Sequence, residues 1–177
     1  MMTIDLKKDS EMTPLIGLFV AMVEENFLRL TRSLEGVSPD ELIYTGLSHD
    51  ANSIAQLLKH LAYVDLNWVY RIKGDAMPLS VECAYGPMVD ENGQLPKVEN
   101  RTLEDLLSAY EYVLEQLKEE CRKRTDAELQ KTVAYEEGKT ATIQWGIWHM
   151  ADHSRYHQAH INQLRSWFKQ ERGIRCS

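Results

Sequence analysis

Four of the six histidines of this chain lie close together, in the stretch WHMADHSRYHQAHINQLRSW at positions 148–167. They are His149, His153, His157 and His160. A neutral imidazole can bind a divalent metal, carry a proton or donate a hydrogen bond. His153 and His157 are four residues apart, so on a helix both ring nitrogens face the same side and can bind one cation. The stretch therefore predicts either a metal site or a helix in which histidines pack without a ligand.

A helical projection indicates which of these histidines face the core. At about 100° per residue, all four fall within an arc of about 80°. His153 and His157 lie within or beside the apolar side of the helix, and His149 and His160 lie nearer its edge. The apolar residues are Ile143, Met150, Ile161, Leu164 and Phe168. Two buried imidazoles cost free energy unless each has a partner, and one shared metal ion supplies both.

A third ligand has to come from another helix, and His60 is the candidate. It borders an apolar stripe, at about 40° from Val64 and about 60° from Leu57. Three histidines with an open fourth position are typical of a catalytic zinc site rather than a structural one. We therefore predict that His60, His153 and His157 bind a divalent ion such as zinc or nickel, although iron and copper also accept this donor set.

The remaining polar residues near these ligands have open roles. We expect His149 and His160 to support the ligands, to face a substrate or to be solvated, and His49 to be a loop residue. Four more side chains lie within about one helical turn of the ligands, where packing or surface exposure is the expected role and orientation of a ligand or substrate the alternative. They are Tyr63, Asp65, Asn67 and Tyr156. The sequence identifies no general base.

Apolar residues at helical spacing predict four long amphipathic helices. Their expected ranges are 14–35, 53–73, 102–124 and 142–169. Thr13-Pro14 and the capping boxes Ser53-x-x-Gln56 and Thr102-x-x-Asp105 mark three of the starts. Residues 74–101 carry proline and glycine and predict a long loop, and KTVAYEEGKT predicts a connector with a short strand. We expect an all-α protein, a four-helix bundle, in a single domain of residues 1–177.

The composition excludes several classes of protein. The net charge of −7 and the pI of about 5.4 disfavour nucleic acid as a partner. The three cysteines form no C-x-x-C motif and fit a reducing compartment. No apolar run is long enough to span a membrane, and the first residues lack a signal peptide's apolar core. We therefore expect a cytoplasmic protein whose partners are neither nucleic acid nor a membrane.

Other catalytic motifs are absent. No H-E-x-x-H occurs, and no glutamate has a histidine three residues later, as ferritin-like di-iron sites require. Gly138-Lys139-Thr140 resembles the end of a phosphate-binding loop, but Val133 stands where that motif needs glycine. The three-histidine site is therefore the main chemical prediction.

The segments that carry these histidines resemble those of a known superfamily. HSRYHQAHI at 153–161, NSIAQLLKHLAYVDLNWVYRI at 52–72 and LEGVSPDEL at 34–42 are similar to segments of the DinB/YfiT-like superfamily of metalloenzymes, in particular its YfiT-like branch. The resemblance covers most of the chain. It implies a four-helix bundle in which His60, His153 and His157 bind the metal.

The same resemblance implies several activities. Members of the superfamily include bacillithiol S-transferases, mycothiol-dependent isomerases and transferases, and metal-dependent hydrolases. We expect a thiol S-transferase or a small-molecule hydrolase, with a low-molecular-weight thiol as the partner in the first case. The alternative is a non-catalytic bundle that binds metal or dimerises. Relatives often pair through their helices, so a homodimer is also expected.

Overall fold

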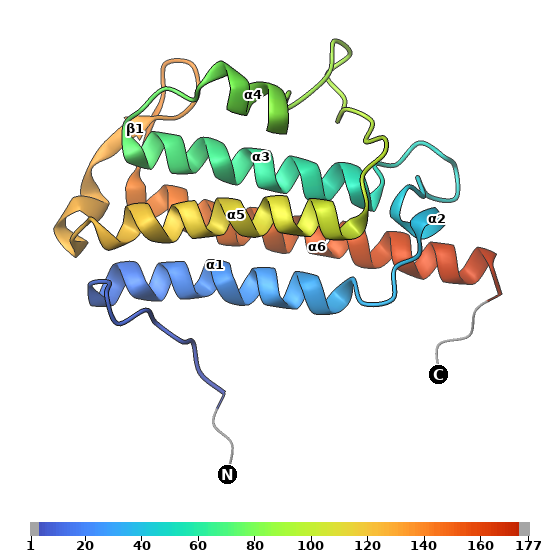
Figure 1. The fold of residues 1–177 in the computed structure, drawn as a ribbon, viewed down its shortest axis with the longest axis horizontal. Helices are drawn as coiled ribbons and strands as arrows, with labels where there is room; N and C mark the ends of the chain where they lie inside the picture. Colours follow the sequence, from blue (N-terminus) through green and yellow to red (C-terminus); the bar gives the residue numbers. More distant parts are fainter. Residues whose placement is uncertain (1–3, 174–177) are drawn as a thin grey trace.

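Four long helices lie side by side along the longest axis of the protein (Figure 1). The computed structural model describes residues 4–173, so residues 1–3 and 174–177 of the predicted domain, Cys176 included, lie outside it. The helices are α1 (Pro14–Ser33), α3 (Ile54–Lys73), α5 (Leu103–Arg122) and α6 (Ile143–Glu171). The predicted four-helix bundle is confirmed. Among the described residues, no helix combines the length and apolar character needed to cross a membrane.

The direction of the helices explains the long segment after α3. Helices α3 and α5 run in the same direction, and α1 and α6 run in the opposite one (Figure 1). A helix of 20 residues is about 30 Å long, so the chain must travel back along the whole bundle before α5 can begin. This return segment contains α4 (Leu79–Tyr85), which lies above α3 and which the sequence analysis does not predict. Helix α4 is short and buries none of its residues, so its sequence has no apolar pattern at helical spacing from which a helix could be predicted.

The helix starts are held by side-chain caps. Ser53 and Gln56 form the predicted capping box at α3, and Thr102 and Asp105 form the one at α5. We expected the Thr13 hydroxyl to cap α1, but it does not accept a hydrogen bond from the helix. It donates one to the Asp126 carboxylate at 2.6 Å. Asp126 also accepts the backbone N–H of Ile16 at 2.9 Å. A carboxylate from a distant segment therefore satisfies the donors that α1 leaves free.

Short elements connect the long helices. Helix α2 (Pro39–Leu42) follows α1, and the 3₁₀ helix η1 (Asp126–Gln130) follows α5. The connector before α6 folds as an antiparallel hairpin of β1 (Thr132–Ala134) and β2 (Thr140–Thr142), in which Val133 pairs with Ala141. The hairpin has two strands where the sequence predicted one, and it places Tyr135 against the ring of Trp68 in α3.

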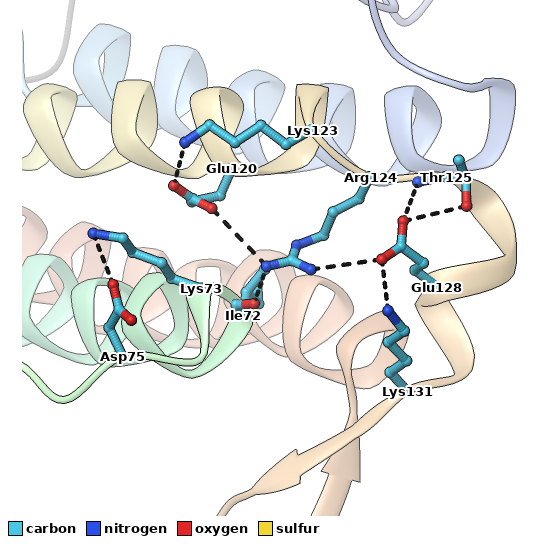
Figure 2. A network of polar contacts seen from close by, with 9 residues as sticks. All are labelled: Ile72, Lys73, Asp75, Glu120, Lys123, Arg124, Thr125, Glu128 and Lys131. Carbon is cyan, nitrogen blue, oxygen red and sulfur yellow. Dashed lines mark hydrogen bonds and ion pairs between the residues drawn. The ribbon is translucent and has the colours of Figure 1, made fainter.

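Arg124 ties together the end of the bundle that carries the hairpin (Figure 2). Its guanidinium donates to the Ile72 carbonyl at the end of α3, and lies 3.9 Å from a carboxylate oxygen of Glu120 in α5. It lies at the same distance from a carboxylate oxygen of Glu128 in η1, which also pairs with Lys131 at 2.7 Å. A single side chain thereby links α3, α5 and the segment that leads into the hairpin.

Polar side chains occur inside the apolar core. The Tyr110 hydroxyl of α5 donates to Asp65 Oδ2 of α3 at 2.7 Å. Between α1 and α6, Asn26 Nδ2 donates to the Ala151 carbonyl at 2.7 Å, and Gln158 Nε2 donates to the Asn26 carbonyl at 2.9 Å. All of these side chains are buried, so each pair fixes how two helices are aligned.

Asp65 makes the stability of this core depend on pH. Burial raises the pKa of Asp65 to about 8, against the opposing effect of the Tyr110 hydrogen bond, from 3.8 in an exposed carboxyl. The folded state therefore binds the Asp65 proton more tightly than the unfolded state does. The contribution of this proton to the free energy of unfolding is complete below about pH 4 and is lost as the pH rises toward 8. We expect Asp65→Asn, which stays neutral, to remove this dependence.

The difference in the free energy of unfolding between Asp65→Asn and the unchanged protein should grow from about pH 5 to about pH 8. The increase of this difference between pH 5 and pH 8 has an upper limit of about 4 kcal/mol, at about 1.4 kcal/mol per pH unit. Urea unfolding at the two pH values measures it. The histidines titrate in both proteins and cancel in the difference. A difference that is constant with pH would mean that Asp65 is ionised in the folded protein.

Candidate metal centre

The three predicted ligands come together between α3 and α6. The Nε2 atoms of His60 and His153 are 3.2 Å apart, and those of His153 and His157 are 3.0 Å apart. Potential ligand atoms of all three residues lie within 4.8 Å of one another. The rings meet nearly edge to face, at interplanar angles of 71°, 79° and 86°. Each residue is partly exposed, so the group lies at the margin of the core.

The spacing of these nitrogens fits a shared cation. A tetrahedral ion with metal–nitrogen bonds of about 2.1 Å separates its ligands by about 3.4 Å, and an octahedral ion by about 3.0 Å. The observed 3.0 and 3.2 Å fall at or near these values. The Nδ1 atoms of all three rings are buried and have no hydrogen-bond partner in the described part of the chain. Within residues 4–173, the polar contacts of these rings are therefore those between their Nε2 atoms, and a shared cation would bind the lone pairs there.

The electrostatics of the site keep the three rings neutral. Burial, reinforced by the neighbouring histidines, lowers the pKa of His153 to about 3 and that of His157 to about 4. Burial also lowers the pKa of His60. At neutral pH each ring therefore has a lone pair free for a ligand bond, as metal binding requires.

The packing of α6 places His153 and His157 at the edge of its core-facing side. Met150, Ser154, Gln158 and Ile161 are buried and form the centre of the core-facing side. His153 and His157 each precede one of these buried polar residues, so they lie beside the core side and not within it. Sequence analysis missed Ser154 and Gln158, because polar residues interrupt the apolar pattern on which it relied.

His60, His153 and His157 form what we call the ligand group, and the histidines with open roles lie outside it. The ring of His149 stacks on that of His153, with centroids 5.3 Å apart and an angle of 15°, and its Nδ1 accepts the Trp68 indole N–H at 3.1 Å. His160 is exposed and contacts the rings of Tyr156 and His157 edge to face. His49 is exposed in a loop, as predicted.

Of the other four candidate residues, only Tyr156 contacts a candidate ligand. Tyr63 donates to Glu82 of α4, and Asn67 Nδ2 donates to the Tyr63 carbonyl at 2.8 Å. Asp65 accepts from Tyr110, and the exposed Tyr156 ring contacts His157 edge to face. Packing and surface positions, which we had expected for them, describe all four.

A column of aromatic rings leads from the hairpin to the ligand group, and sequence analysis missed it. Trp68 stacks on Tyr135, with centroids 5.3 Å apart, and Trp145 stacks on His149 at 4.9 Å. Trp145, His149 and His153 are spaced by four residues, which is a signal for stacking along one helix face. Tyr135 could not be placed in this way, since it is on the hairpin.

Comparison with known proteins gives two findings. The family profile described as Mycothiol-S-transferase matches residues 18–170, which include all three ligand candidates. The Bacillus subtilis (strain 168) protein named "Uncharacterized protein YkkA" is 46% identical over 168 residues, which cover 94% of this chain and 95% of that protein.

Replacement of any one of the three histidines should weaken the binding of a divalent metal ion. We expect His60→Ala, His153→Ala and His157→Ala each to lower zinc affinity at least about 100-fold, because loss of an outer partner alone costs 10- to 100-fold. Elemental analysis of tag-free protein and competition with a fluorescent chelator measure this loss. His49→Ala is the matched control and should retain one ion per chain. Equal zinc binding by all four variants would show that the ion binds elsewhere.

Proposed function

The chain belongs to the mycothiol S-transferase family, and on this premise we propose that it is a metal-dependent enzyme that transfers a low-molecular-weight thiol to a small electrophile. The family implies mycothiol as the thiol. The observation that carries the proposal is the convergence of three neutral imidazoles on one point, at the partly exposed seam between α3 and α6.

The reaction joins two substrates and releases one acid. The S–H bond of the thiol and the bond between the electrophile's carbon and its leaving group are broken, and a C–S bond forms. The proton and the leaving group depart together as the acid HX. A divalent ion held by the three histidines would lower the pKa of a bound thiol, so that the nucleophilic thiolate forms near neutral pH.

The residues around the histidines prepare the site for this chemistry. His60, His153 and His157 stay neutral because burial lowers the pKa of each, so protons do not compete for their lone pairs at pH 7. The buried residues behind them, among them Met150 and Ile161, keep water from the core side. His60, His153 and His157 are themselves partly exposed, so the other side of the group can be reached from solvent.

We propose zinc or nickel as the ion, since both accept three imidazoles and an open position. Hydrolysis of a small molecule is the second candidate activity, because the same site could use water as the nucleophile. The family favours the thiol. The homodimer expected from the sequence stays a prediction.

Thiol consumption tests the proposal. Zinc-loaded and nickel-loaded protein should consume mycothiol in the presence of monochlorobimane, and chelation should reduce the rate at least about 100-fold, because the thiol then reacts with its unshifted pKa. Fluorescence of the bimane adduct measures the rate, with bacillithiol, glutathione and cysteine as the other thiols. Restoring the ion should restore the rate.

The controls separate the alternatives. His153→Ala should lose turnover together with its metal, whereas His49→Ala should keep both. An unchanged rate after verified metal loss would rule out the proposed mechanism. Turnover of an ester panel without consumption of thiol would indicate the hydrolase. Stoichiometric metal without turnover of any substrate would indicate the non-catalytic bundle.

A further inference from the structure

We propose that His149 contacts the electrophilic substrate and donates a hydrogen bond to it from Nε2, and that Trp68 fixes the tautomer in which it does so. This inference rests on the proposed function, because it assigns a role beside the same three ligands. It concerns a residue that is not part of the ligand group.

The hydrogen bond from Trp68 decides which nitrogen of His149 carries the proton. Trp68 Nε1 lies 3.1 Å from His149 Nδ1. An indole N–H can only donate, so Nδ1 has to be the acceptor. The proton of the neutral imidazole is then on Nε2, and His149 presents an N–H there and not a lone pair.

Trp68 is held in place from several sides. It is fully buried, and its ring stacks on Tyr135 while the guanidinium carbon of Arg71 lies 4.9 Å from its centroid. Gly146 of α6 packs directly on it, since a Cβ at that position would lie 2.4 Å from Trp68 Cε3. Glycine within a helix is destabilising compared with alanine. Its presence is explained by this close approach of the indole, which brings the N–H within reach of His149.

The ring of His149 lies between two others. Trp145 stacks on it at 4.9 Å and 24°, and His153 stacks on it at 5.3 Å and 15°. The stack fixes the plane of the ring, and the Trp68 hydrogen bond fixes its rotation within that plane. His149 Nε2 has no hydrogen-bond partner within residues 4–173, and it is not a buried atom. It therefore reaches solvent, one helical turn from the ligand His153.

The chemistry of the transfer calls for such a donor. As the C–S bond forms, negative charge develops on the leaving group or on an oxygen of the electrophile. A neutral N–H that is already oriented can stabilise this charge without reorganisation. Because Nδ1 is engaged with Trp68, His149 acts as a donor and not as a general base. The substrate class is an electrophile with a hydrogen-bond acceptor next to the reacting carbon.

Three variants of the zinc-loaded protein test the assignment. His149→Phe keeps the stack and removes the donor, and its kcat should fall about 100-fold with unchanged zinc content. His149→Gln offers an amide N–H of similar reach and should recover part of this loss. Trp68→Phe keeps the buried ring but releases the tautomer, so kcat should fall several-fold. His49→Phe is the matched control, with full activity. Bimane adduct formation with the most active thiol gives kcat and KM.

A nitrogen NMR experiment on the ring of His149 reads the tautomer without using activity. The unchanged protein should show the proton on Nε2, and Trp68→Phe should show a mixture of both tautomers. A proton on Nδ1 in the unchanged protein, or an unaltered kcat in His149→Phe, would overturn the inference while leaving the proposed function intact. Absence of turnover with every thiol in the unchanged protein would instead overturn the proposed function, and with it the substrate contact.

Discussion

The packing of α3 against α6 is the contact on which the site depends. His60 and His153 are 93 residues apart in sequence, and their Nε2 atoms meet only across this seam. Two features of the fold hold it. Gly146 allows Trp68 of α3 to lie directly against the backbone of α6, and the Arg124 contacts align the end of α3 with the segment that leads into α6. A shift of either helix by one residue would rotate one set of histidines away from the other, because each residue turns a helix by about 100°.

The depth of the histidines follows from this packing. At the centre of the core-facing side of α6, Ser154 and Gln158 are buried, and Gln158 has hydrogen-bond partners within the bundle. One position away, His153 and His157 are buried enough to stay neutral and exposed enough to be reached. A fully buried position would exclude a substrate, and a fully exposed one would let the rings be protonated more easily.

Much of the fold and of the site could be predicted from the sequence, because the signals are local. The helices follow from hydrophobic period and capping residues, and the ligand set follows from two histidines at helical spacing and a third on an apolar stripe. Other features depend on contacts between distant segments. Asp126 caps α1 from η1, and Tyr135 reaches Trp68 from the hairpin. The tautomer of His149 depends on an indole on another helix, so no pattern along α6 could have revealed it.

Burial favours the neutral form of two kinds of titratable group in this bundle. It lowers the pKa of the histidines and raises that of Asp65, so both are favoured in their neutral forms. The ligand group itself contains histidines and no carboxylate. Carboxylate ligands would neutralise part of the charge of a bound divalent ion, whereas three neutral imidazoles leave that charge undiminished. The charge of an ion held by these histidines would act in full on whatever occupied the open side, and lowering the pKa of a thiol there is the effect that the proposed S-transfer would require at neutral pH.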